Sequence, residues 1–75
     1  MRPAAHFRAS SQWNGQKDNL TMSSFGLLCY LRLRELQGQP APTRRELFEV
    51  LPTSERTVNG GLAELKRSGL VVESK

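Results

Sequence analysis

The last third of the chain carries a close succession of helix-start and helix-stop signals, which restrict the fold more than any other feature. Thr43 can cap the start of a helix, and Pro52 ends that helix. Ser54 can cap the next helix, for which Gly69 is a C-terminal stop. The β-favouring residues 70–72 follow directly. The sequence therefore predicts two short helices joined by a tight turn and followed by a strand.

A longer helix is predicted upstream of this pair. It begins near Thr21 or Ser23, both of which can cap, and runs to about Gln37 before Gly38. Its body contains no β-branched residue and is rich in Leu, Arg and Glu, which are good helix formers. Two prolines in the following linker prevent the helix from continuing. We therefore expect three helices.

The apolar residues of this first helix fall on two stripes at about 100° per residue. One stripe consists of Leu27, Leu28 and Leu31. The other consists of Phe25, Cys29, Leu33 and Leu36. A helix that is apolar on two sides must bury both or expose one. We expect the first stripe to receive the other two helices. The second either forms the interface of a homodimer or is covered by Phe7 and Trp13 from the N-terminal segment.

Residues 1–19 show no hydrophobic period and are predicted to be a flexible basic arm, preceding a domain over residues 20–75. Arg2, Arg8 and Lys17 outnumber the one acidic residue of the arm. The arm either lies along phosphates or folds back over apolar surface. Its His6 is expected to be an exposed residue of the tail.

The overall charge favours polyanionic partners. The 75 residues include 11 Lys and Arg against 7 Asp and Glu, giving a net charge of +4, and nucleic acid is the preferred candidate. The single Cys29 cannot form an internal disulfide, and no apolar run reaches the roughly 18 residues of a membrane span. We therefore expect a cytoplasmic protein with no membrane association.

The last helix has the pattern of a helix with one buried side. Val58, Leu62 and Leu65 lie at i, i+4 and i+7 and form its inner stripe. The opposite side and its margins supply the predicted base contacts, which are Arg56, Thr57, Asn59, Gly60 and Ala63. The predicted phosphate contacts are Thr43, Arg44, Arg45, Ser54, Lys66 and Arg67.

Gly60 and Gly61 are costly in a helix, by roughly 1 kcal/mol each relative to Ala. One explanation is that the helix backbone closely approaches another surface at each glycine, DNA at Gly60 and the second helix at Gly61. A helix that orders fully only on binding is the other explanation.

These segments together are similar to one known type of domain. The run from Ser54 to Leu70 reads Ser-x-x-Thr-Val-x-x-x-Leu-x-x-Leu-x-x-x-Gly-Leu, and it follows Pro-Thr-Arg-Arg-Glu-Leu over 42–47. The chain resembles the winged helix-turn-helix domains of bacterial, phage and plasmid replication-initiator-like proteins and small transcriptional regulators. The resemblance implies a mainly α fold of three helices with a minimal or truncated β-wing.

The chain departs from this type at the wing, which is normally a hairpin of two strands. Only residues 70–73 are left to form a strand here. Its edge would be unpaired unless it pairs with the segment before the second helix or with another subunit.

The resemblance implies sequence-specific binding of double-stranded DNA, with the helix over 54–68 in the major groove, in transcription regulation or replication. The alternative is a protein-interaction module that binds a polymerase, a replication factor or a host factor, which the second stripe favours. An enzyme is not expected, because Cys29 has apolar neighbours and no Gly-rich phosphate loop is present. No residues have metal-ligand spacing, so neither a metal nor a cofactor is expected.

Overall fold

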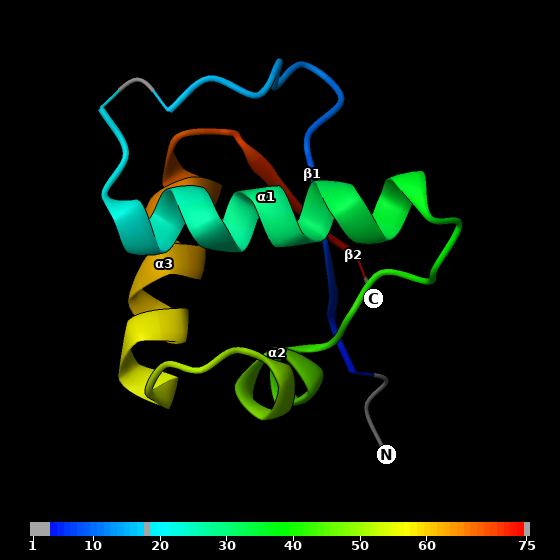
Figure 1. Ribbon diagram of the computed structural model, residues 1–75, viewed down its shortest axis with the longest axis vertical. Helices are drawn as coiled ribbons and strands as arrows, with labels where there is room; N and C mark the ends of the chain where they lie inside the picture. Colours follow the sequence, from blue (N-terminus) through cyan, green and yellow to red (C-terminus); the bar gives the residue numbers. More distant parts are fainter. Residues whose placement is uncertain (1–3, 18, 75) are drawn as a thin grey trace.

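Three helices and a two-stranded antiparallel sheet make up the fold, in the order shown in Figure 1. The computed structural model describes residues 4–17 and 19–74. The elements are β1 (His6–Ala9), α1 (Met22–Leu36), α2 (Arg44–Val50), α3 (Glu55–Arg67) and β2 (Val71–Ser74). The three predicted helices are present, and about half of the chain is helical.

Each helix begins at a hydroxyl cap, and the three caps are Thr21, Thr43 and Ser54. In each case the side-chain oxygen accepts a hydrogen bond of 3.2 Å from the backbone N–H three residues later. At the other end of α3, Gly69 takes a φ of +75°, which favours glycine. These start and stop signals are confirmed where the sequence predicts them.

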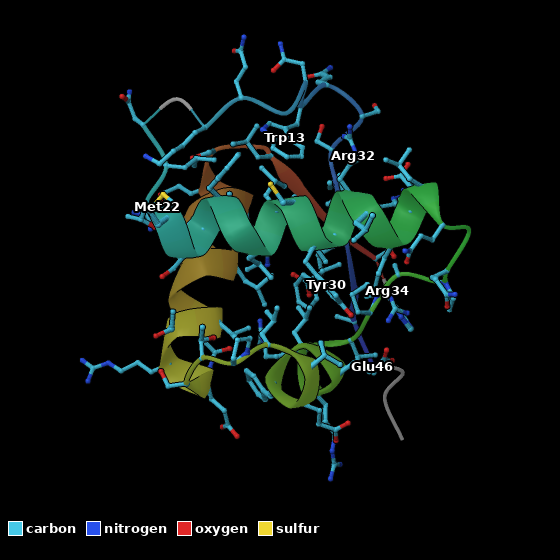
Figure 2. All side chains as sticks on the ribbon, in the orientation of Figure 1. Trp13, Met22, Tyr30, Arg32, Arg34 and Glu46 are labelled. Atoms are coloured by element: carbon cyan, nitrogen blue, oxygen red, sulfur yellow. The ribbon has the colours of Figure 1, made fainter. Side chains whose placement is uncertain are left out.

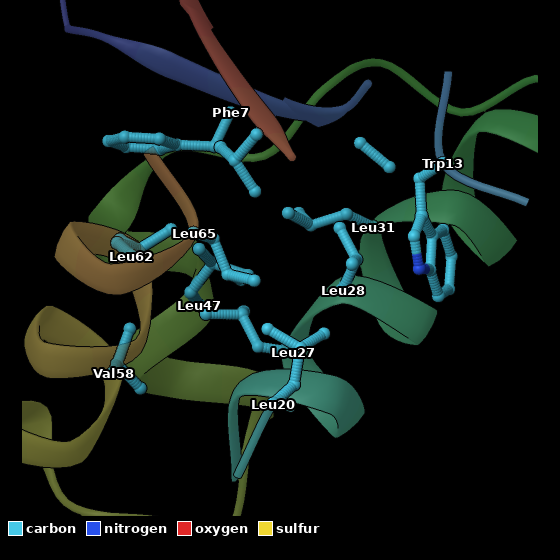
Figure 3. Packing of buried hydrophobic residues seen from close by; sticks show 12 residues of the cluster. Phe7, Trp13, Leu20, Leu27, Leu28, Leu31, Leu47, Val58, Leu62 and Leu65 are labelled. Carbon is cyan, nitrogen blue, oxygen red and sulfur yellow. The ribbon is translucent and has the colours of Figure 1, made fainter. Parts of the chain in front are cut away.

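The core forms where α1 crosses α3 and β1 (Figures 1 and 3). Both predicted inner stripes are confirmed, since their six side chains are almost completely buried: Leu27, Leu28, Leu31, Val58, Leu62 and Leu65. Leu47 is the one residue of α2 that is fully buried. Val50, which the spacing also places on the buried side of α2, is 52% exposed. The helix ends at Val50, and the next residue, Leu51, packs against the core instead.

The flexible arm predicted over residues 1–19 is wrong at residues 6–9, which form a strand, and its residues 1–3 and 18 lie outside the described residues. Residues 6–9 pair with β2 in antiparallel register, from His6 opposite Ser74 to Ala9 opposite Val71. Phe7 is 1% exposed and belongs to the central core rather than to the second stripe of α1. The domain therefore includes these residues, and a boundary at residue 20 separates a strand from its own sheet.

The strand β1 also contacts the segment before α2. The backbone N–H of Phe7 donates to the carbonyl of Pro42 at 2.9 Å, and His6 forms an isolated bridge with Thr43. His6 is half-buried, and its Nδ1 lies 2.9 Å from the carbonyl oxygen of Ala41. Its expected place in an exposed tail is thus wrong. The partner of β2 is the N-terminal strand rather than the segment before α2.

The connection from β1 to α1 lies along the second stripe of α1. The edge of the Trp13 ring faces Phe25, with ring centroids 6.3 Å apart and an angle of 74° between the planes. The guanidinium of Arg32 lies 5.3 Å from the centroid of the Trp13 ring, and Figure 2 shows both residues on the same side of α1. Trp13 therefore covers Phe25, whereas Leu33 and Leu36 remain 51% and 76% exposed.

Candidate nucleic-acid interface

The outer face of α3 lies opposite its buried stripe and is open to solvent. Because Val58, Leu62 and Leu65 anchor the other side, residues spaced by three or four along the helix point outward together. The exposed residues of this outer face are Arg56, Asn59, Gly60, Ala63 and Arg67. Four of the five predicted base contacts thus lie on accessible surface.

Thr57, the fifth predicted base contact, has a structural task at the start of α3. Its backbone N–H donates to the Oγ of Ser54 at 3.2 Å, and its hydroxyl lies 2.9 Å from the same oxygen. Thr57 is half-buried. Both side chains are thereby engaged in capping, so Ser54 and Thr57 are less available to a ligand than the residues further along the outer face.

The two adjacent glycines have different surroundings. A Cβ at Gly60 would meet no atom within 4 Å, whereas one at Gly61 would lie 3.2 Å from Cδ2 of Leu27. The helix that approaches Gly61 is therefore α1, and the expected approach of the second helix is wrong. Beside this crossing, the Ser24 hydroxyl donates to the Glu64 carboxylate at 3.0 Å. The small Gly61 allows α1 and α3 to approach each other closely.

The predicted phosphate contacts in α2 are accessible. The Arg44 guanidinium lies 5.4 Å from the centroid of the Phe7 ring. Arg45 lies 3.8 Å from the Glu49 carboxylate, but both side chains are largely exposed, so solvent screens this pair and it contributes little. Arg56 and Arg67 make no ion pair within residues 4–17 and 19–74. Four arginines are thus available to polyanions.

Lys66, another predicted phosphate contact, is engaged by an acid that the sequence did not single out. Its ammonium donates a hydrogen bond to the carboxylate of Glu73 and forms an ion pair with it. Glu73 also borders a shallow pocket of about 280 Å³ between β1, α2 and β2. That pocket is lined by Ala4, Ala5, Phe7, Thr43, Arg44, Arg45 and Glu73.

A mostly apolar groove of about 230 Å³ lies between the start of α1 and the turn that joins α2 to α3. Its lining includes Met22, Leu27, Leu51, Pro52 and Val58. Met22 is 70% exposed at this groove. Sequence reasoning missed the groove because its lining joins the start of α1 to turn residues that come from another part of the chain.

The described segments hold no group of three or more His, Cys, Asp or Glu side chains arranged to bind a metal ion. None of the helices in these segments is long and apolar enough to cross a membrane. Cys29 is an exposed free thiol on α1.

Comparisons with protein-family models, with curated proteins and with solved structures give no match for this chain. Any function must therefore be inferred from its own residues and their geometry.

Proposed function

We propose that the protein binds double-stranded DNA through the outer face of α3. The observation that carries this proposal is the division of α3 into an anchored aliphatic side and an open side bearing Arg56, Asn59 and Arg67. An arginine can donate two hydrogen bonds to guanine O6 and N7, and an asparagine can pair with adenine N6 and N7. These donors stand on one accessible surface of a well-anchored helix.

Small residues on the same face support entry of α3 into the major groove. Gly60 and Ala63 lie between the polar side chains and are exposed. Within residues 4–17 and 19–74, no other element places an atom within 4 Å of a Cβ at Gly60, so that surface is open to an external ligand. A helix that presents small side chains there can approach base edges closely.

The phosphate backbone is the proposed partner of the exposed arginines. Arg44 and Arg45 are in the first turn of α2, and Arg67 is in the last turn of α3. In helix-turn-helix proteins the first helix of the pair crosses the DNA backbone while the second enters the groove. Such contacts position the protein and carry no sequence information directly.

The arrangement of elements is compatible with a winged-helix layout, which this proposal adopts. In that layout the last strand needs a partner to form the wing. Here β1 supplies the partner of β2 from the other end of the described chain. The proposed role, following the resemblance, is that of a small bacterial or phage regulator or replication-associated protein acting in the cytoplasm.

A salt titration with random duplex DNA tests this proposal. A protein that neutralises several phosphates loses affinity steeply as the salt concentration rises, because counterions are released on binding. We expect a complex in fluorescence anisotropy at low salt and its loss at moderate salt. Selection and sequencing of the bound duplexes would then identify the preferred bases. Absence of a complex at the lowest salt concentration would reject the proposal.

Protein interaction is the second candidate function, and the exposed apolar surface of α1 favours it. Leu33 and Leu36 remain open beside Cys29. A second copy of the chain is the proposed occupant, with Phe25 excluded from the contact because Trp13 covers it. We expect Leu33→Glu to sediment as a monomer under conditions where the wild type sediments as a dimer. A monomeric wild type would reject the homodimer.

A further inference from the structure

Charged side chains from three elements meet near the end of β2. Glu73 of β2 pairs with Lys66 of α3, and it borders the same pocket as Arg44 and Arg45 of α2. We refer to Arg44, Arg45 and Lys66 as the basic cluster. One carboxylate thus pairs with Lys66, which the sequence predicts as a phosphate contact, and borders the same pocket as two arginines that the proposed function assigns to DNA phosphates.

The sheet determines where this carboxylate lies. Glu73 stands directly opposite Phe7 in the antiparallel register, and opposed residues project from the same face of a sheet. Phe7 is buried, and the Arg44 guanidinium lies against its ring. The Glu73 side chain is only 25% exposed. Backbone pairing therefore holds Glu73 beside the basic cluster.

A carboxylate and a phosphate compete for the same donors. An ammonium that donates to one anion has fewer hydrogen atoms left for another, and its charge is already compensated. Lys66 in its observed pair is in this state. Its charge therefore acts less strongly on a phosphate while Glu73 remains paired with it.

We propose that Glu73 is an intramolecular competitor of DNA phosphates at the basic cluster, and that it lowers the affinity of the protein for DNA. This inference rests on the proposed DNA binding. The residues named so far on this surface promote DNA binding, whereas Glu73 opposes it. Lys66 then contributes little to the salt dependence of binding as long as Glu73 is present.

Glu73→Gln tests the competition, because it removes the charge and keeps the size of the side chain. Freeing one cation for a phosphate makes the slope of log K against log salt more negative by about 0.9. With this change in slope, the ratio of the variant's affinity to the wild-type affinity is roughly eightfold larger at about 0.1 M salt than at 1 M salt. The measurement is fluorescence anisotropy with one random duplex over a series of salt concentrations. Circular dichroism checks that the variant is folded.

Glu35→Gln is the matched control, because it removes the same charge from α1 outside the basic cluster, where Glu35 lies 3.8 Å from Arg32. We expect a smaller gain from this variant and no change in slope. Lys66→Gln should leave the slope of the wild type unchanged. In the Glu73→Gln background it should abolish the gain.

Equal gains from Glu73→Gln and Glu35→Gln would overturn the inference, since net charge alone would then explain both. A slope reduced by about 0.9 in Lys66→Gln alone would also overturn it, because Lys66 would already contact a phosphate in the wild type. If the wild type and all variants fail to bind duplex at any salt concentration, the proposed function itself is rejected, and the competition with it.

Discussion

The two faces of α3 differ in their contacts with the rest of the protein. On the inner face, Val58, Leu62 and Leu65 are buried, and Gly61 lies against α1. Each of these is explained by contacts within the protein. On the outer face, a Cβ at Gly60 would meet no other element of the described chain within 4 Å. The comparison shows that internal packing can account for a glycine at one position of a helix, Gly61, and not for a glycine at the adjacent position, Gly60.

This contrast matters because both glycines have the same cost in a helix. Each forfeits roughly 1 kcal/mol relative to Ala. At Gly61 a Cβ would lie 3.2 Å from Cδ2 of Leu27 and 3.6 Å from Oγ of Ser24, so the close packing of α1 favours a small residue there. At Gly60 no described contact does so, and a ligand that approaches the helix closely is the explanation that the proposed function supplies.

The largest effect is expected from Leu62→Ala on the inner face. Leu62 is fully buried, so the substitution should lower the free energy of unfolding by about 2 to 5 kcal/mol. Chemical denaturation followed by circular dichroism measures the loss. Val50→Ala is the control, because Val50 is 52% exposed, and it should change stability by no more than about 0.5 kcal/mol. Similar losses in both variants would contradict the assignment of the core.

Leucine placed in turn at the two glycines sharpens the comparison. Gly61→Leu should destabilise the protein by about 1 to 3 kcal/mol, because its side chain would overlap with Leu27 of α1. Gly60→Leu should stabilise it by roughly 0.5 to 1 kcal/mol, because leucine favours the helix and meets open space. Thermal unfolding of the two variants measures both effects.

Gly60→Leu should also weaken DNA binding, since the larger side chain would keep the helix away from the base edges. A variant that is more stable and yet binds less well would separate the outer face from the fold. Unchanged affinity would show that no ligand approaches Gly60 closely.

Arg56→Ala tests the outer face with the least effect on the fold. Arg56 is exposed, so stability should stay within about 0.5 kcal/mol of the wild type. Binding to a selected duplex should weaken by about 1 to 3 kcal/mol, with relaxed preference for one base. Anisotropy with the selected and a scrambled duplex measures the difference. Arg8→Ala removes the same charge from β1 and serves as the control. Equal losses on both duplexes would make Arg56 a phosphate contact.

The helix boundaries were predictable because their signals act over a few residues. The hydroxyls of Thr21, Thr43 and Ser54 bond to backbone N–H groups three positions away, and such bonds need no tertiary partner. The inner stripe of α3 was predictable for a similar reason, since a helical period is visible in the chain itself. The outward placement of Arg56 follows from that stripe by geometry.

The strand β1 was not predictable from its own four residues. The alternation of buried Phe7 and Ala9 with exposed Arg8 is too short to stand out from an irregular segment. Its partner β2 lies at the opposite end of the described chain. The same holds for Glu73, whose closeness to Lys66 arises only when β2 packs beside α3.

By itself the sequence determined the three helices, their caps and the side of α3 that is buried, because backbone hydrogen bonding and helical periodicity are local. Only the tertiary structure decided that the N-terminal segment completes the sheet, that Trp13 covers Phe25 and that Gly61 meets α1. These contacts join residues far apart in the chain, and the burial of apolar surface that stabilises them depends on how the elements pack. The charges around Glu73 belong to this second group.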